Sequence, residues 1–129
     1  MLDLCAIHHI AIICSDYTAT KKFYTEILGL EMIREHYREA RQSWKLDLRL
    51  GDQYVIEIFS FTNPPQRVSQ PEARGLRHLA FAVNDIEAQV RALNNAGVSS
   101  EPLRVDEFTG KRFTFFADPD GLPLELYEQ

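Results

Sequence analysis

The segment His9-Ile-Ala-Ile-Ile-Cys-Ser-Asp16 recurs in the same chain as His78-Leu-Ala-Phe-Ala-Val-Asn-Asp85. Each copy consists of a histidine, six mostly apolar residues and an aspartate. A second pair of similar segments follows, Val55-Ile-Glu-Ile-Phe59 and Pro123-Leu-Glu-Leu-Tyr127. The copies are offset by 69 residues at the histidines and by 68 at the glutamates. This period is too long for a solenoid of short repeats and predicts two supersecondary modules instead.

Both halves of the chain show the same predicted order of elements: a strand, a helix and three further strands. Asp16 and Asp85 are suited to cap the two helices, and Gly29 and Gly97 to end them. Runs of β-branched and alternating apolar residues predict the strands. They cover residues 7–14, 31–37, 44–50 and 54–61 in the first half, and 76–83, 98–105, 112–117 and 122–127 in the second.

Helical spacing predicts which side chains of each helix face the sheet. In the first helix the predicted face is Ala19, Phe23 and Ile27. In the second helix it is Ile86, Val90 and Leu93. The segment Asp118-Pro-Asp-Gly121 is typical of a turn, because proline presets φ and glycine tolerates a positive φ.

The length of 129 residues fits a single domain spanning the whole chain. One module is expected over about residues 5–61 and the other over about 76–129. The linker between them, residues 62–75, contains Pro64, Pro65 and Pro71.

Charge and composition exclude several classes of function. The net charge of −5, without a long basic run, argues against binding to nucleic acid or an anionic membrane. No apolar run approaches the ~20 residues of a membrane span, and the N-terminus lacks the basic start of a signal peptide. Cys5 and Cys14 lie too far apart along one strand for a disulfide within the chain. We expect both to be free core residues in a cytoplasmic protein.

Strand alternation places four polar residues on the sheet face opposite the helices. His9 shares its face with Ala11, and His78 shares its face with Ala80, so small neighbours leave room for a cavity. Glu57 and Glu125 fall on the same face of their strands. Histidine and glutamate are ligands for divalent metals, and their repetition in register favours a single metal site over four separate structural roles.

The other two histidines have no counterpart in the repeat. His8 should point away from His9, and Arg77 occupies the corresponding place in the second copy. We therefore predict that His8 is structural and that His36 lies outside the site.

The chain resembles the vicinal oxygen chelate superfamily, also called the glyoxalase, bleomycin-resistance and extradiol-dioxygenase group. Besides the two histidine segments, the resemblance is carried by Phe23-Tyr-Thr-Glu-Ile-Leu-Gly-Leu30, by Arg77-His-Leu-Ala-Phe81, and by Asp118-Pro-Asp-Gly121 leading into Leu124-Glu-Leu126. It covers essentially the whole chain. It implies an α+β fold in which two paired β-α-β-β-β modules form a cup-shaped sheet around a metal ion, and it implies a homodimer.

The ligand set His9, Glu57, His78 and Glu125 resembles that of glyoxalase I. The resemblance implies a metal-dependent lyase or isomerase, similar to lactoylglutathione lyase, that acts on a small molecule through a metal-bound enediolate. It also implies that Glu125 is the catalytic base, although the residues alone leave Glu57 as an equal candidate. Nickel or zinc is the expected ion, with cobalt, manganese and iron as alternatives.

Other activities of the group remain open at the level of sequence. A ring-cleaving dioxygenase uses two histidines and one glutamate, epimerases tend to carry glutamine where Glu57 stands, and sequestering proteins lack the ligands. Ile13 stands where glutathione-dependent relatives carry an arginine, so the partner is expected to be another thiol or an oxoacid. Cations near strand ends could hold an anionic substrate: Arg38, Arg41, Lys45, Arg104, Lys111 and Arg112.

Overall fold

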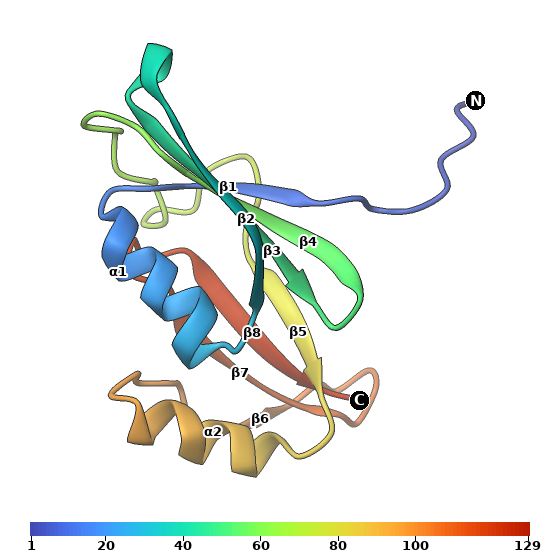
Figure 1. The fold of residues 1–129 in the computed structure, drawn as a ribbon. Coiled ribbons are helices and arrows are strands. Elements are labelled where there is room, and N and C mark those ends of the chain that lie inside the picture. The colour runs from blue at the N-terminus through green and yellow to red at the C-terminus, as the bar shows by residue number, and fades with distance from the viewer. The chain divides into compact units, whose positions relative to one another are not determined.

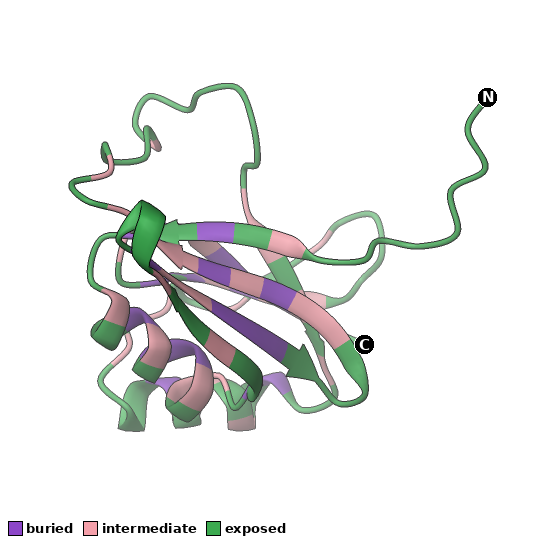
Figure 2. Ribbon diagram, turned by 45° about the horizontal axis from the view of Figure 1, so that its top comes forward, coloured by how far each residue is buried: buried purple, intermediate pink, exposed green.

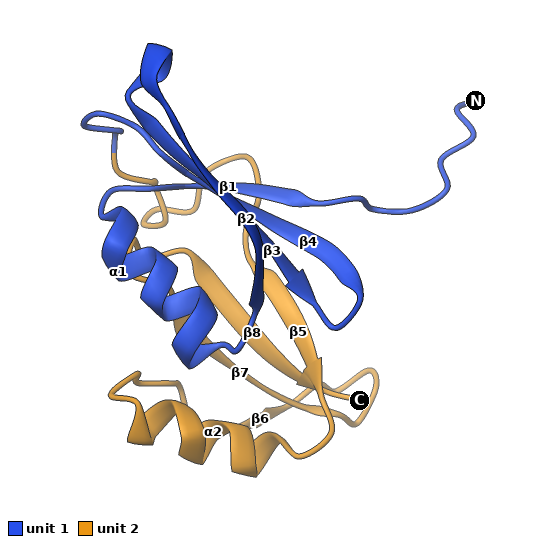
Figure 3. Ribbon diagram, in the orientation of Figure 1, with its two compact units in different colours: residues 1–65 blue, residues 66–129 orange.

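The computed structural model describes residues 1–129, which divide into two compact units, residues 1–65 and 66–129 (Figures 1 and 3). Each unit holds one four-stranded sheet and one α-helix of at least six residues. The α+β class and the β-α-β-β-β order predicted for each half are confirmed. No helix is both long enough and apolar enough to cross a membrane.

The first unit begins with β1 (Ile10–Cys14), followed by α1 (Tyr17–Lys22) and the antiparallel strands β2 (Glu31–Arg38), β3 (Ser43–Leu50) and β4 (Gln53–Ser60). The strand order is β1-β4-β3-β2. Strand β1 lies parallel to β4, whereas the other neighbours are antiparallel. This topology brings the first and last strands of the unit side by side.

The second unit repeats this topology. It consists of β5 (Leu79–Val83), α2 (Ile86–Asn95), β6 (Arg104–Val105), β7 (Arg112–Ala117) and β8 (Pro123–Glu128). The strand order is β5-β8-β7-β6, with β5 parallel to β8. The sequence repeat is therefore a structural repeat in the order of its strands and α-helices.

The buried face of α1 differs from the predicted one. Asp16 caps the helix as expected, accepting a hydrogen bond from the Ala19 backbone at 3.0 Å. However, Ala19 is exposed, and the buried side chains are Thr20, Phe23 and Tyr24. The helix continues as a π-turn over Phe23–Ile27. Residues spaced four apart therefore do not all lie on the face that packs against the sheet.

Three strand predictions were too long. The first strand of each unit begins three residues later than expected, directly after His9 and His78. The strand predicted over 98–105 is reduced to two residues, because Pro102 lacks the N–H that a ladder requires. Cys14 is buried as predicted, but Cys5 is exposed because it precedes β1; neither cysteine forms a disulfide.

The core of each unit lies on the helix-facing side of its sheet. In the first unit Leu46, Leu48, Ile56 and Ile58 are at most 1% exposed. Figure 2 shows the resulting alternation of buried and less buried residues along the strands. The opposite face is left free to carry the polar residues of the candidate site.

Candidate metal centre

In the first unit, His9 and Glu57 lie together on the face opposite α1. His9 directly precedes β1, and its neighbour on the same face, Ala11, pairs with Glu57 across the parallel β1–β4 ladder. The small alanine lets the imidazole reach across the strand boundary. His9 Nε2 lies 3.2 Å from Glu57 Oε1.

The second unit contains the same arrangement. His78 directly precedes β5, and Ala80 pairs with Glu125 across the parallel β5–β8 ladder. His78 Nε2 lies 3.0 Å from Glu125 Oε2. The two pairs occupy equivalent register positions, as the sequence offset predicts.

These nitrogen–oxygen separations suit a shared cation. Two ligand atoms about 2.1 Å from an ion and at right angles to each other lie about 3.0 Å apart. Each unit supplies two of the four predicted ligands, and neither unit by itself gathers three or more potential ligands. Within each unit the pair offers one imidazole nitrogen and one carboxylate, both of which are ligands for divalent ions.

Glu57 lies in a charged hydrogen-bond network. The Tyr54 hydroxyl donates a short hydrogen bond to Glu57, and Lys45 Nζ lies 3.0 Å from its carboxylate. Lys45 also pairs with Asp47 at 2.8 Å, and this aspartate is only 1% exposed. Burial raises the pKa of Glu57, but the hydrogen bonds from Tyr54 and Lys45 outweigh burial and hold its pKa below the ordinary value. Tyr54 and Lys45 thus both favour the ionised form of the Glu57 carboxylate.

Glu125 has different surroundings. Asp47 pairs with Glu57 across the β3–β4 ladder, whereas Phe115 occupies the corresponding position opposite Glu125. The Phe115 ring meets the His78 ring edge-on at 5.0 Å between centroids. The only ion pair of Glu125 is with His78. One unit therefore surrounds its glutamate with charges and the other with aromatic side chains.

His8 lies beside the candidate site, contrary to prediction. Its Nδ1 atom is 2.7 Å from Nδ1 of His9, and its ring centroid is 5.2 Å from that of Tyr54. Strand alternation does not apply to His8 because β1 begins only at Ile10. His36, predicted to lie outside the site, is exposed on β2 and forms no hydrogen bond or ion pair with His9 or Glu57.

Sequence reasoning missed Tyr54, Asp47 and Phe115. A signal for Asp47 was present, since it is the one acidic residue of its strand and lies between Leu46 and Leu48. Its importance depends on cross-strand register, which composition does not reveal.

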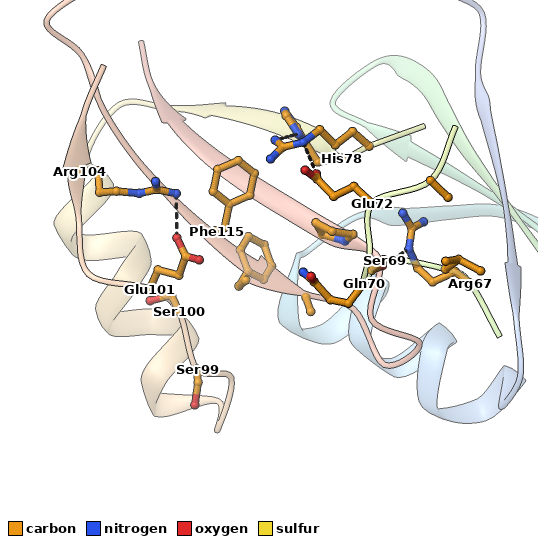
Figure 4. Close-up of a pocket in the computed structure, with 16 residues that line it drawn as sticks. Arg67, Ser69, Gln70, Glu72, His78, Ser99, Ser100, Glu101, Arg104 and Phe115 are labelled. Atoms are coloured by element: carbon orange, nitrogen blue, oxygen red, sulfur yellow. Dashed lines mark hydrogen bonds and ion pairs between the residues drawn. The ribbon is translucent and has the colours of Figure 1, made fainter. Parts of the chain in front are cut away.

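A cavity of about 530 Å³ adjoins His78 in the second unit (Figure 4). Phe115 lines it together with three arginines, two of which are paired with carboxylates: Arg77 with Glu72, and Arg104 with Glu101. The space beside His78 is large enough for a small organic molecule.

Of the remaining predicted cations, Arg112 is paired with Glu87 and Glu128, and Lys111 donates to the Gln129 carbonyl. Arg41 is exposed. These three residues give no sign of a substrate contact.

A family model described as the Glyoxalase/Bleomycin resistance protein/Dioxygenase superfamily matches residues 6–126. The chain belongs to this superfamily. The protein YaeR of Escherichia coli (strain K12) is 63% identical to it, and the match covers the whole of both chains. The solved structure of a glyoxalase family protein from Enterococcus faecalis is 58% identical, with a TM-score of 0.89, over 95% of this chain and 97% of that one. The fold described above is therefore that of the superfamily.

More distant members of the superfamily have names that state an activity. A 2-epi-5-epi-valiolone epimerase of Actinomyces sp is 32% identical, over 94% of this chain and 78% of its own length. A probable lactoylglutathione lyase of Vibrio parahaemolyticus is 27% identical, over 93% of this chain and 88% of its own. The superfamily thus includes different reactions among relatives of similar distance.

Proposed function

We propose that this protein is a metal-dependent lyase or isomerase of the glyoxalase I type. The observation that carries the proposal is the repeated pair of one histidine and one glutamate, with nitrogen–oxygen separations of 3.2 and 3.0 Å at equivalent register positions. The likeness to a probable lactoylglutathione lyase supports the same reaction class.

The proposed ligands are His9, Glu57, His78 and Glu125. Their two carboxylates balance the charge of a dication, for which nickel or zinc is the first choice. When bound, the ion supplies Lewis-acid stabilisation of negative charge on two adjacent substrate oxygens.

In this proposal the two glutamates have different roles. Glu57 stays in place because Tyr54 and Lys45 both hold its carboxylate. Glu125 has only His78 as an ion-pair partner, so its carboxylate is freer to move. Glu125 takes the proton from the carbon beside one substrate oxygen and returns it to the neighbouring carbon.

Metal content tests the site before any substrate is known. Protein purified without a chelator should contain one divalent ion per set of four ligands, by elemental analysis. His9→Ala and His78→Ala should each abolish retention, whereas the matched control His36→Ala should not. A metal-free wild type that also fails to bind added nickel or zinc would refute the site. A screen of the loaded protein against 2-oxoaldehydes with several thiols then tests the reaction.

A second candidate function is epimerisation. The epimerase relative shares 32% identity, and Ile13 offers no charge for a glutathione carboxylate. Incubating the loaded protein with 2-epi-5-epi-valiolone in deuterated water distinguishes the candidates. An epimerase would return an inverted product carrying deuterium, whereas a lyase of glyoxalase type would leave this compound unchanged.

A further inference from the structure

Arg38, at the end of β2, lies against two aromatic rings on the site face of the first unit. Its guanidinium carbon is 4.8 Å from the centroid of the Phe59 ring and 5.8 Å from that of Phe61. Phe59 alternates onto the same face of β4 as Glu57, and Lys45, which pairs with Glu57, lies 6.0 Å from the same ring. Arg38 therefore belongs to the face that carries half of the proposed ligands.

Arg38 is the cation of this face that no carboxylate neutralises. Arg34 pairs with Asp47, and Lys45 pairs with both Asp47 and Glu57. Arg38 donates only to the Ser43 hydroxyl, at 2.8 Å, and its Nε atom is buried without any partner. A half-buried guanidinium with unused donors is costly unless an acceptor completes it.

The position of Arg38 indicates how long a ligand must be to reach it from His9 and Glu57. Phe59 is two residues beyond Glu57, a rise of about 7 Å along a strand. A molecule that begins at His9 and Glu57 and follows β4 would cross the Phe59 ring and end at Arg38. Ile13, exposed on the neighbouring strand, offers no charge for this purpose.

The second unit provides an internal contrast. Arg104 lies in the same way over Phe113 and Phe115, at 4.9 and 5.7 Å. Arg104, however, is paired with Glu101 at 2.9 Å. The two units thus share an arginine stacked on a pair of phenylalanines, but only the arginine of the first unit lacks a carboxylate.

We infer that Arg38, supported by Phe59 and Phe61, binds the anionic group of an organic-acid substrate whose opposite end lies at His9 and Glu57. The ligand class is a small acid with a carboxylate or phosphate at one end and two adjacent oxygens at the other. Guanidinium suits both kinds of anion because its parallel N–H groups can donate to two oxygens. This inference rests on the proposed function for the position of the adjacent oxygens.

A first experiment tests Arg38 without any metal. Glutarate and inorganic phosphate are titrated separately into the metal-free full-length protein, and the arginine Nε–H signals are followed by NMR. The signal missing from Arg38→Gln identifies Arg38, and it should shift on titration while that of Arg41, assigned through Arg41→Gln, should not. If only one of the two anions shifts the signal, that anion identifies whether Arg38 prefers a carboxylate or a phosphate. If neither anion moves the Arg38 signal, the inference is overturned, whatever the metal content.

A second experiment measures the distance between the two ends. Monohydroxamates of succinic, adipic and suberic acid present two adjacent oxygens and a carboxylate at increasing separation, and their methyl esters lack the charge. In nickel-loaded protein, calorimetry should show one acid binding about tenfold more tightly than its ester. Arg38→Gln should remove this preference and Arg38→Lys retain part of it, whereas Arg41→Gln should keep it in full.

The two experiments separate the two proposals. Anion binding at Arg38 without metal-dependent hydroxamate binding would support the arginine site and contradict the metal site. Ester and acid binding the loaded protein equally would overturn the inference while leaving the metal site intact. Equal melting temperatures of the two glutamine variants would exclude a general folding defect.

Discussion

At the scale of single residues, the two glutamates differ more in their neighbours than in their positions. Both pair with an alanine across a parallel ladder, and both contact a histidine. Glu57 is held by Tyr54 and Lys45, whereas Glu125 faces Phe115. A carboxylate held by several donors is suited to remain a metal ligand. A carboxylate with a single partner is more free to leave the metal and act as a base.

The first prediction concerns these roles. Glu125→Gln should retain metal and lose most turnover, because an amide offers an oxygen ligand but does not accept a proton at neutral pH. His78→Ala should lose both metal and turnover. Metal content and rate are measured together on whichever substrate the screen identifies.

Glu57→Gln is the matched comparison for this prediction. If Glu125→Gln keeps nearly full activity while Glu57→Gln is inactive, the base is Glu57 instead. If both variants remain active, proton transfer by a metal ligand is wrong.

At the scale of elements, the sequence predicted those features that depend on a few neighbouring residues, such as helix caps and turns. Asp85 caps α2 by accepting from the Ala88 backbone at 3.0 Å, and β7 has the predicted bounds. The π-turn after α1 was missed because it depends on how the segment fits its sheet, whereas the length of β6 was overestimated because Pro102 interrupts the predicted strand. The 118–121 turn was predicted, with Gly121 at φ +80°.

The second prediction concerns this turn. One oxygen of the buried Asp118 carboxylate accepts hydrogen bonds from the backbone N–H groups of Asp120 and Leu122, both at 2.9 Å. Asp118→Ala should lower the free energy of unfolding by about 1–3 kcal/mol, because two donors lose their acceptor. Asp118→Asn should lose much less, since its amide keeps an oxygen. Urea denaturation checks both, and equal losses would contradict this account.

The third prediction concerns the joint between β7 and β8. The Arg112 side chain and backbone both donate to Glu128, and these bonds lower the pKa of Glu128 from 4.5 to about 2. A depressed pKa stabilises the fold fully above about pH 4.5, and this contribution disappears as the pH falls towards 2. Glu128→Gln should therefore melt a few degrees below wild type at pH 7 and together with it near pH 2.

Glu107→Gln is the control for this pH dependence. Glu107 is exposed, and its substitution removes the same negative charge as Glu128→Gln. Its melting temperature should follow that of the wild type throughout. A gap between Glu128→Gln and wild type that stays constant down to pH 2 would contradict the assignment.

At the scale of the whole molecule, the repeat predicted that both halves share one order of elements and carry a histidine and a glutamate on the same sheet face. The contacts of His9 with Glu57 and of His78 with Glu125 were not predicted, because they depend on the parallel pairing of the first and last strands of each unit. Asp47 and Phe115 were not predicted either, because hairpins whose register only the fold fixes bring them beside the glutamates. The union of the two pairs in one site remains a prediction.

The fourth prediction is that the protein is a homodimer. Each unit leaves one sheet face with polar and aromatic groups to be covered, and symmetric dimers are the commonest assembly. Sedimentation equilibrium at micromolar concentration should give twice the 14.9 kDa of one chain. A mass of one chain over the whole concentration range would contradict the prediction.

The contrast between Asp47 and Phe115 also bears on the descent of the chain. Two identical half-length polypeptides, encoded by one gene, would have to carry the same residue opposite both glutamates, so any mutation would act twice. Once two copies are fused in one gene, each half of the gene can mutate independently of the other. A gain of charge in one half need not be inherited by the other. The unequal surroundings of Glu57 and Glu125 are a difference that two halves made from one shared coding sequence could not have.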